Sequence, residues 1–282
     1  MTDTEHLLQS RSFVELGARQ RARAVLDPGS FRELLGPFDR LMSPWLPRQG
    51  IVPQADDGVV IAKGRLNGRQ AVVAAIEGGF QGGSMGEVGG AKIAGALELA
   101  IEDNRNGIPT CAVLLLETGG VRLQEANLGL AAIAEIQAAI VELRAWQPVI
   151  GLIAGSVGCF GGMSIAAGLC SHLLVTREAR LGLNGPQVIE QEAGIGEYDA
   201  KDRPFIWSLS GGEQRHASGL VDGYVADDID ALRERLLQLL DAPSRDRASQ
   251  HGWFLDRLAR LGDDCPQLDA AAVRALYQGE AQ

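Results

Sequence analysis

Two stretches of similar form decide the fold: CAVLLLETGG at residues 111–120 and VIGLIAGSVGCFGG at residues 149–162. Each contains a short apolar run and ends in paired glycines, and each leads into a helical pattern of apolar residues. A third apolar run follows at residues 172–176. Short buried strands that alternate with helices are typical of βαβ units with right-handed crossovers, so the sequence predicts an α/β fold.

Upstream of these stretches, residues 58–77 predict a β-hairpin. Asn67-Gly68 lies between two β-rich runs, and this pair favours a type I′ turn because both central residues need positive φ. A helix is expected next, since Ile93, Leu97 and Ile101 recur at i, i+4 and i+8. Asn106-Gly107 should end it.

The N-terminal residues 1–50 read as a helical arm, and residues 51–282 as one domain. Ser30, with Glu33 three residues later, matches a capping box and predicts a helix start. Three arginines, Arg19, Arg21 and Arg23, favour a solvated helix face over an anion contact. An apolar cluster that must pack on something is formed by Leu41, Met42, Trp45 and Leu46.

Several helices are expected in the C-terminal third of the chain. Residues 185–191 open a helix with Pro186 at its first position, and residues 193–204 resemble a mobile loop. Residues 226–240 form an amphipathic pattern, and two further helical stretches follow. We find no internal repeat and no linker.

Composition excludes several classes of function. The 282 residues carry a net charge of −10, without the basic stripe of a nucleic-acid binder or the basic amphipathic helix of a membrane-surface protein. No apolar run is long and continuous enough to span a bilayer, and the polar start predicts no signal peptide. Cys111, Cys159, Cys170 and Cys265 form no CxxC pair, so neither a zinc ribbon nor a disulfide framework is indicated and a cytoplasmic location is expected. Cys111 and Cys170 are expected to be buried.

The two glycine turns suggest that backbone amides bind a negatively charged oxygen. The first amides of a helix have no partner within it and lie where its dipole favours negative charge, while glycine lets a ligand approach closely. Gly119-Gly120 and Gly161-Gly162 therefore predict backbone donors for an oxyanion. One such turn alone is a weak motif, because glycine turns also simply end strands.

Other catalytic signals are weak or missing from the sequence. It contains no phosphate-binding GxxxxGK[ST] loop and no GxSxG elbow. The histidines, His6, His172, His216 and His251, lack metal-ligand spacing. His172 reads as a core histidine and His216 as a solvated one. A reaction that needs mainly charge stabilisation by amides fits this inventory best.

Four motifs in order carry a resemblance to a known family: GGSMGEVGGAK at 82–92, TGGVRLQE at 118–125, GGMS at 161–164 and GPQVIEQ at 185–191. Together they resemble the carboxyltransferase β subunit of bacterial acetyl-CoA carboxylase, over about Phe80 to Gln191. The chain is still more similar to malonate decarboxylase β subunits, in its length, its N-terminal SFVEL and DPGSF segments, the missing zinc ribbon and its loop at 192–204.

The resemblance implies a crotonase-like fold with a ββα spiral core, a helical N-terminal arm and C-terminal helices. It also implies a γ subunit of the same fold, an acyl-carrier protein subunit and an acyl-carrier transferase subunit as partners. The implied reaction is decarboxylation of a malonyl thioester on the carrier's phosphopantetheine-type arm, with no tightly bound cofactor and no metal.

The same resemblance implies the site residues. Gly119 and Gly120, with the amides of Val121 and Arg122, are expected to bind the thioester oxyanion, and the second turn, Gly161 and Gly162, has a less defined catalytic role. The acyl thioester is expected against Gly82, Gly83, Ser84, Met85 and Gly86. Arg122 has an alternative interpretation as a structural ion-pair residue and Glu125 as a first-turn helix acid. No proton donor is assigned.

Two other functions remain open on the sequence alone. A carboxyltransferase subunit of a biotin-dependent acyl-CoA carboxylase would use the same oxyanion site. A scaffold subunit without catalytic residues would hold the partner and the carrier. The apolar cluster at 41–46 further predicts that the chain is not active alone.

Overall fold

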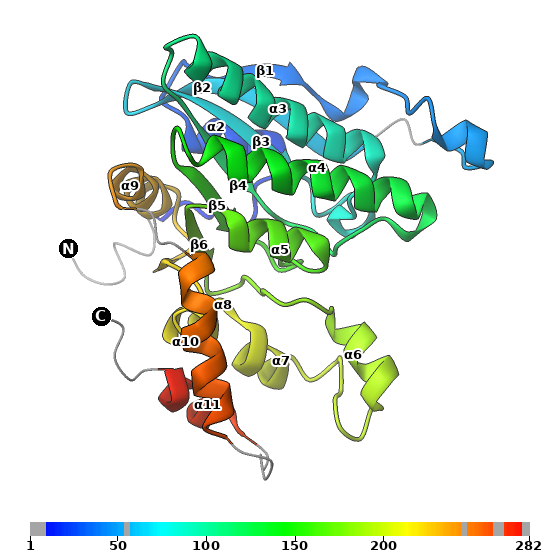
Figure 1. Ribbon diagram of the computed structural model, residues 1–282, viewed down its shortest axis with the longest axis vertical. Coiled ribbons are helices and arrows are strands. Elements are labelled where there is room, and N and C mark those ends of the chain that lie inside the picture. The colour runs from blue at the N-terminus through cyan, green and yellow to red at the C-terminus, as the bar shows by residue number, and fades with distance from the viewer. Residues whose placement is uncertain (1–9, 54–56, 244–246, 262–267, 278–282) are drawn as a thin grey trace.

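The computed structural model describes residues 10–53, 57–243, 247–261 and 268–277. At its centre lies a seven-stranded sheet with the strands in sequence order, β1 to β7 (Figure 1). The strands are β1 (Arg32–Leu35), β2 (Val59–Leu66), β3 (Arg69–Ile76), β4 (Thr110–Leu115), β5 (Val149–Ile153), β6 (His172–Thr176) and β7 (Gly223–Val225). Pairing is antiparallel from β1 to β3 and parallel from β3 to β7. The predicted α/β alternation is confirmed.

The β2–β3 hairpin forms where the sequence predicts it. Asn67 and Gly68 have φ values of 49° and 79°, as a type I′ turn requires. Their backbone amides both donate to the carboxylate of Asp27, at 3.0 and 2.8 Å. The turn is therefore held by its own backbone preference and by a contact from the N-terminal segment.

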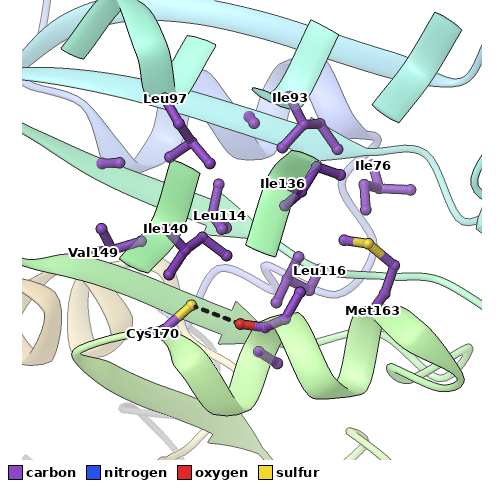
Figure 2. Packing of buried hydrophobic residues seen from close by; sticks show 14 of the residues in the cluster. Ile76, Ile93, Leu97, Leu114, Leu116, Ile136, Ile140, Val149, Met163 and Cys170 are labelled. Carbon is purple, nitrogen blue, oxygen red and sulfur yellow. Dashed lines mark hydrogen bonds between the residues drawn. The ribbon is translucent and has the colours of Figure 1, made fainter. Parts of the chain in front are cut away.

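Three helices cover one face of the sheet: α3 (Glu87–Arg105), α4 (Asn127–Leu143) and α5 (Gly162–Leu169) (Figure 1). Figure 2 shows Ile93 and Leu97 of α3 and Ile136 and Ile140 of α4 gathered around Leu114 of β4. A Cβ atom on Gly90 would lie only 2.5 Å from the Cβ of Ala132. Glycine at that position thus allows α3 and α4 to pack closely.

The opposite face is covered by α2 (Ala18–Val25) and α9 (Ile229–Leu240). Phe13, Ala22 and Val25 are buried in the same cluster as residues from β2, β3, β4 and β5. The segment 13–26 therefore packs against the sheet and contributes side chains to the core, although it belongs to the segment predicted as an arm. The boundary at residue 50 between an N-terminal arm and the rest of the chain stays a prediction.

The helix start predicted at Ser30 is wrong, because Arg32–Leu35 form β1 along the edge of β2. The Ser30 hydroxyl accepts from the amide of Arg65 at 3.0 Å, and the Glu33 carboxylate pairs with Arg19 at 2.5 Å. Both side chains are thus engaged by distant segments rather than by a local cap. Beyond β1, the apolar cluster is packed only in part, because Leu46 is buried whereas Leu41, Met42 and Trp45 are exposed.

The C-terminal third adds a group of helices below α5 and β6 in Figure 1, and α8 among them packs against β6 and β7. They are α6 (Pro186–Ala193), α7 (Arg203–Ser210), α8 (Gly212–Ala217), α10 (Arg247–Ala259) and α11 (Ala270–Tyr277). The predicted helices at 185–191 and 226–240 and the two closing helices are confirmed, and Pro186 opens α6. The described loops contain 3₁₀ helices at Pro37–Asp39, Leu46–Gln49, Gln81–Gly83 and Leu123–Glu125. Within the described ranges, no helix combines the length and apolarity needed to cross a membrane.

Candidate active site

The two glycine turns lie side by side at the ends of β4 and β5. Thr118 and Cys159 pair in parallel, and the amide of Phe160 donates to the carbonyl of Thr118 at 3.0 Å. A Cβ atom on Gly161 would lie 3.2 Å from the Cα of Gly120 and 3.8 Å from the amide nitrogen of Val121. The chain thus brings together the two turns that the sequence marks 42 residues apart.

Most amides of the first turn are used inside the chain. The N–H of Gly119 donates to the carbonyl of Gly82 at 2.8 Å, and that of Gly120 donates to Oγ1 of Thr118 at 3.1 Å. The N–H of Arg122 donates to the carbonyl of Met85 at 2.8 Å. Among the described residues, the amide of Val121 meets no such acceptor.

The second turn leads directly into a helix. Gly161 adopts φ 61° and ψ −146°, a conformation that is essentially restricted to glycine, and its amide donates to the carbonyl of Leu183 at 2.7 Å. Gly162 and Met163 are the first residues of α5, so their amides precede the first helical hydrogen bond. No acceptor in the described part of the chain engages either amide.

The geometry narrows the predicted set of oxyanion donors. Val121 and Gly162 supply N–H groups that are free in the described residues, one from each turn, and the turns are in contact. The amides of Gly119, Gly120 and Arg122 instead fix the shape of the first turn. The role of Gly161 is conformational, because its positive φ directs the chain into α5.

The predicted thioester-binding residues 82–86 lie against the first turn. Gly82 and Gly83 have φ values of 63° and 64°, and a Cβ atom on Gly83 would lie 1.9 Å from the carbonyl oxygen of Glu117. The amide of Met85 donates to the carbonyl of Gly120 at 2.7 Å. A Cβ atom on Gly86 would lie 2.5 Å from a carboxylate oxygen of Glu125. Glycine thus lets this loop approach the first turn without steric conflict.

The side chain of Arg122 forms a buried ion pair, in agreement with the interpretation of Arg122 as a structural ion-pair residue. Its guanidinium pairs with Glu125 at 2.9 Å and donates to the carbonyl of Ser84 at 3.0 Å, and both charged side chains are buried. Glu125 also accepts from the amide of Glu87, the first residue of α3, at 2.7 Å. This pair therefore joins the 82–86 loop, the first turn and α3.

Two other buried ion pairs were missed by the sequence analysis. Arg21 lies on the buried face of α2 and pairs with Glu117, so its interpretation as a solvated residue is wrong. The spacing of Ala18, Ala22 and Val25 places Arg21 on that face and was the available signal. Lys92 of α3 pairs with Asp57 at 3.0 Å.

The thiols and histidines add no evident nucleophile or base in the described residues. Cys111, Cys159 and Cys170 are buried free thiols. Burial raises the pKa of Cys159 far above its ordinary value and that of Cys111 to about 11, so both stay protonated at neutral pH. His172 is buried at the start of β6, and His216 is exposed and stacked on Tyr224. Within the described ranges, no group of three His, Cys, Asp or Glu side chains has metal-binding geometry. His6 and Cys265 lie outside them.

The fold and the paired glycine turns define the class of protein. Residues 13–250 match the family model of the carboxyl transferase domain, and the chain belongs to this carboxyl transferase family. The expected crotonase-like α/β fold is confirmed by the same relationship.

Within the family, the relatives include malonate decarboxylase proteins. The chain is 71% identical to one in the crystal structure of a Pseudomonas malonate decarboxylase hetero-tetramer in complex with malonate, with a TM-score of 0.90 over 98% of this chain and 100% of that chain. It is 41% identical to the malonyl-S-ACP:biotin-protein carboxyltransferase of Malonomonas rubra, over 84% of this chain and 77% of that protein. The methylmalonyl-CoA carboxyltransferase 12S subunit of Propionibacterium freudenreichii subsp. shermanii is 32% identical, over 82% of this chain and 42% of that protein.

Proposed function

We propose that this chain is the β subunit of a malonate decarboxylase. With a γ subunit of the same fold, it decarboxylates malonyl-S-acyl-carrier protein to acetyl-S-acyl-carrier protein and CO₂. The similarity to the Pseudomonas decarboxylase chain over nearly its full length supports this assignment. The carboxyl transferase family relationship supports a reaction through a thioester enolate.

The observation that carries the proposal is the contact between the two turns that carry the amides of Val121 and Gly162: a Cβ atom on Gly161 would lie 3.8 Å from the amide nitrogen of Val121. In the reaction, the bond between the malonyl Cα and its carboxylate breaks and CO₂ leaves. The electron pair moves into the Cα–carbonyl bond, and negative charge gathers on the thioester oxygen. Amides directed at that oxygen bind the transition state more strongly than the ground state. A proton then adds to Cα, and we assign its donor to no residue.

A second chain is part of the proposal. Two cavities of about 370 and 860 Å³ lie among α5 to α11, and residues 119–121 line neither of them. The first turn therefore lies outside both cavities. A γ subunit that covers the two turns would exclude water from the enolate. The substrate reaches it on the phosphopantetheine-type arm of an acyl-carrier protein, which a transferase subunit loads. We place this complex in the cytoplasm, in keeping with the three buried free thiols.

A second candidate function is carboxyl transfer to a biotin protein. It is favoured by the Malonomonas rubra relative, whose name gives that acceptor. The same amides would stabilise the same enolate, so the two reactions differ in where the carboxyl group goes.

One assay distinguishes these functions. The chain is assembled with its γ subunit and a malonyl-loaded carrier protein, and CO₂ release is measured with and without avidin. We expect release that avidin does not change. Release that depends on an added biotin protein would favour carboxyl transfer, and an assembled complex that releases no CO₂ under either condition would contradict the proposal.

A further inference from the structure

A buried ion pair lies just after β4, immediately before the first turn. Arg21 and Glu117 are 6% and 7% exposed, and Nη1 of Arg21 donates to Oε2 of Glu117. The guanidinium also donates to the carbonyls of Phe13, at 3.1 Å from Nε, and of Val14. Arg21 is thus bound on one side by its own N-terminal segment and on the other by the residue that precedes Thr118.

The Glu117 carboxylate joins the loops that carry both turns. Its Oε1 accepts from the amide of Val157, in the loop between β5 and α5, at 3.3 Å. Close contacts fix it there, because a Cβ atom on Gly155 would lie 1.7 Å from Oε1 and one on Gly78 would lie 2.6 Å from Cγ. Glu117 itself stands two residues before Gly119 in the chain. A single carboxylate therefore links the first turn to the segment that leads into the second.

The N-terminal segment that holds Arg21 is itself fixed by carboxylates. Asp227, between β7 and α9, accepts from the amides of Phe13 and Val14 at 2.8 and 2.9 Å. Glu77, after β3, accepts from the amide of Ala18 at the start of α2 at 2.9 Å. The guanidinium of Arg21 is therefore held, directly or through its own segment, by carboxylates that follow β3, β4 and β7.

We propose that Arg21 and Glu117 are positioning residues that keep the amides of Val121 and Gly162 at the spacing the oxyanion requires. The inference rests on the proposed function for its kinetic readout. A contribution to stability does not explain why these two charged side chains are buried here, since replacing a buried ion pair by apolar residues of similar volume is often neutral or stabilising. Position is a stronger reason, since a misplacement of about 1 Å can cost about 100-fold in rate.

The test compares two double variants in the assembled complex. Arg21→Met with Glu117→Leu removes both charges and the acceptor for Val157. Arg21→Met with Glu117→Gln also removes both charges but keeps an oxygen that can accept from Val157. Each single variant leaves one charge buried without its partner and is expected to lower the melting temperature, whereas the double variants recover it.

The kinetics separate positioning from stability. The Leu-containing double variant should show kcat lowered about 10- to 100-fold with KM unchanged, and the Gln-containing variant should regain most of kcat. The control, Lys63→Met with Asp103→Asn, neutralises the 2.5 Å pair between β2 and the end of α3 and should keep the wild-type kcat.

Amide hydrogen exchange gives a readout that does not depend on the reaction. Residues 155–163 should exchange faster in the Leu-containing variant than in the Gln-containing variant and the control. Wild-type kcat in the Leu-containing variant would overturn the proposal, as would equal kcat loss or equal exchange in the two double variants. A wild-type complex that releases no CO₂ would instead contradict the proposed function, and the exchange comparison would still decide the positioning role.

Discussion

The turn after β4 and the turn after β5 lie side by side, yet they use their backbone amides differently. After Gly119-Gly120 the chain passes through a 3₁₀ helix at Leu123–Glu125 before α4 begins at Asn127. After Gly161 it enters α5 at once. The helix dipole therefore belongs to the second turn, together with amides at the start of α5 that meet no acceptor in the described part of the chain. Most amides of the first turn are instead bound within the chain.

The difference indicates that the first turn mainly supports stability and the second turn mainly supports the reaction. The first turn is a packed junction, where Met85 and Gly120 share a backbone hydrogen bond and the Arg122–Glu125 pair is buried. Among the described residues, the amide of Val121 meets no acceptor in this turn, and the junction holds it beside the second turn. We expect changes around the first turn to lower stability first, and changes at the second turn to lower kcat first.

The largest effect is expected at Glu125. Glu125→Leu leaves the guanidinium of Arg122 buried without its carboxylate, and the free energy of unfolding should fall by about 3–5 kcal/mol. Urea denaturation of the purified chain measures this change. The control is Glu142→Gln in the exposed pair with Arg105, which should change stability by less than about 1 kcal/mol. A stable Glu125→Leu protein that has lost its turnover would mean that the first turn acts through Arg122 in the chemistry.

Gly162→Pro should have the largest effect on the reaction. Proline is well tolerated at the first position of a helix, but it removes the N–H proposed to bind the oxyanion, and kcat should fall about 100- to 1,000-fold, or about 2.7–4 kcal/mol. Steady-state kinetics of the assembled complex provide the measurement.

A matched variant separates the lost amide from the added carbon atoms. A Cβ atom at residue 162 would lie 3.0 Å from Cγ2 of Ile133, so Gly162→Ala adds that contact and keeps the N–H. It should lose much less activity than Gly162→Pro. Equal losses in the two variants would assign the effect to packing against α4, and full turnover in Gly162→Pro would favour the scaffold function.

Much of the fold was predictable because it depends on local patterns. The Asn67-Gly68 turn and the apolar runs of β4, β5 and β6 carry their own signals of conformation and burial. The strand β1 was missed because Ser30 and Glu33 make a locally plausible helix cap, while their actual partners, Arg65 and Arg19, come from other elements.

The candidate site was predictable in its location but not in its detail. Paired glycines mark both turns in the sequence, yet the amide of Gly119 is bound by Gly82 and that of Arg122 by Met85, each 37 residues earlier. No local pattern reports which carbonyl a distant loop will present. The burial of Arg21 likewise depends on Glu117, which stands 96 residues later in the chain.

A smaller effect is expected at Thr118, whose hydroxyl oxygen accepts from the amide of Gly120 at 3.1 Å. Thr118→Val keeps the shape of this fully buried side chain but leaves the buried amide of Gly120 without its acceptor, at a cost of about 1–3 kcal/mol in stability. The reduction in kcat should be smaller than for Gly162→Pro. Thr118→Ser retains the hydroxyl and tests whether the acceptor is responsible, and a valine variant as stable as wild type would show that the first turn needs no such bond.

The smallest expected effect is a gain in stability at Gly168, a glycine of α5 whose added Cβ would touch no neighbouring atom. A Cβ atom on Gly168 would meet nothing within 4 Å, and its φ is not positive, in contrast to Gly161, which precedes the first residue of the same helix. Gly168→Ala should therefore raise the free energy of unfolding by about 0.5–1 kcal/mol, because alanine loses less conformational entropy in a helix. Gly161→Ala should destabilise, because its φ of 61° strains any side chain and the new Cβ would lie 3.2 Å from Gly120. Urea denaturation of the two variants measures both changes, and opposite signs would show that the glycine requirement is confined to the second turn and does not extend along α5.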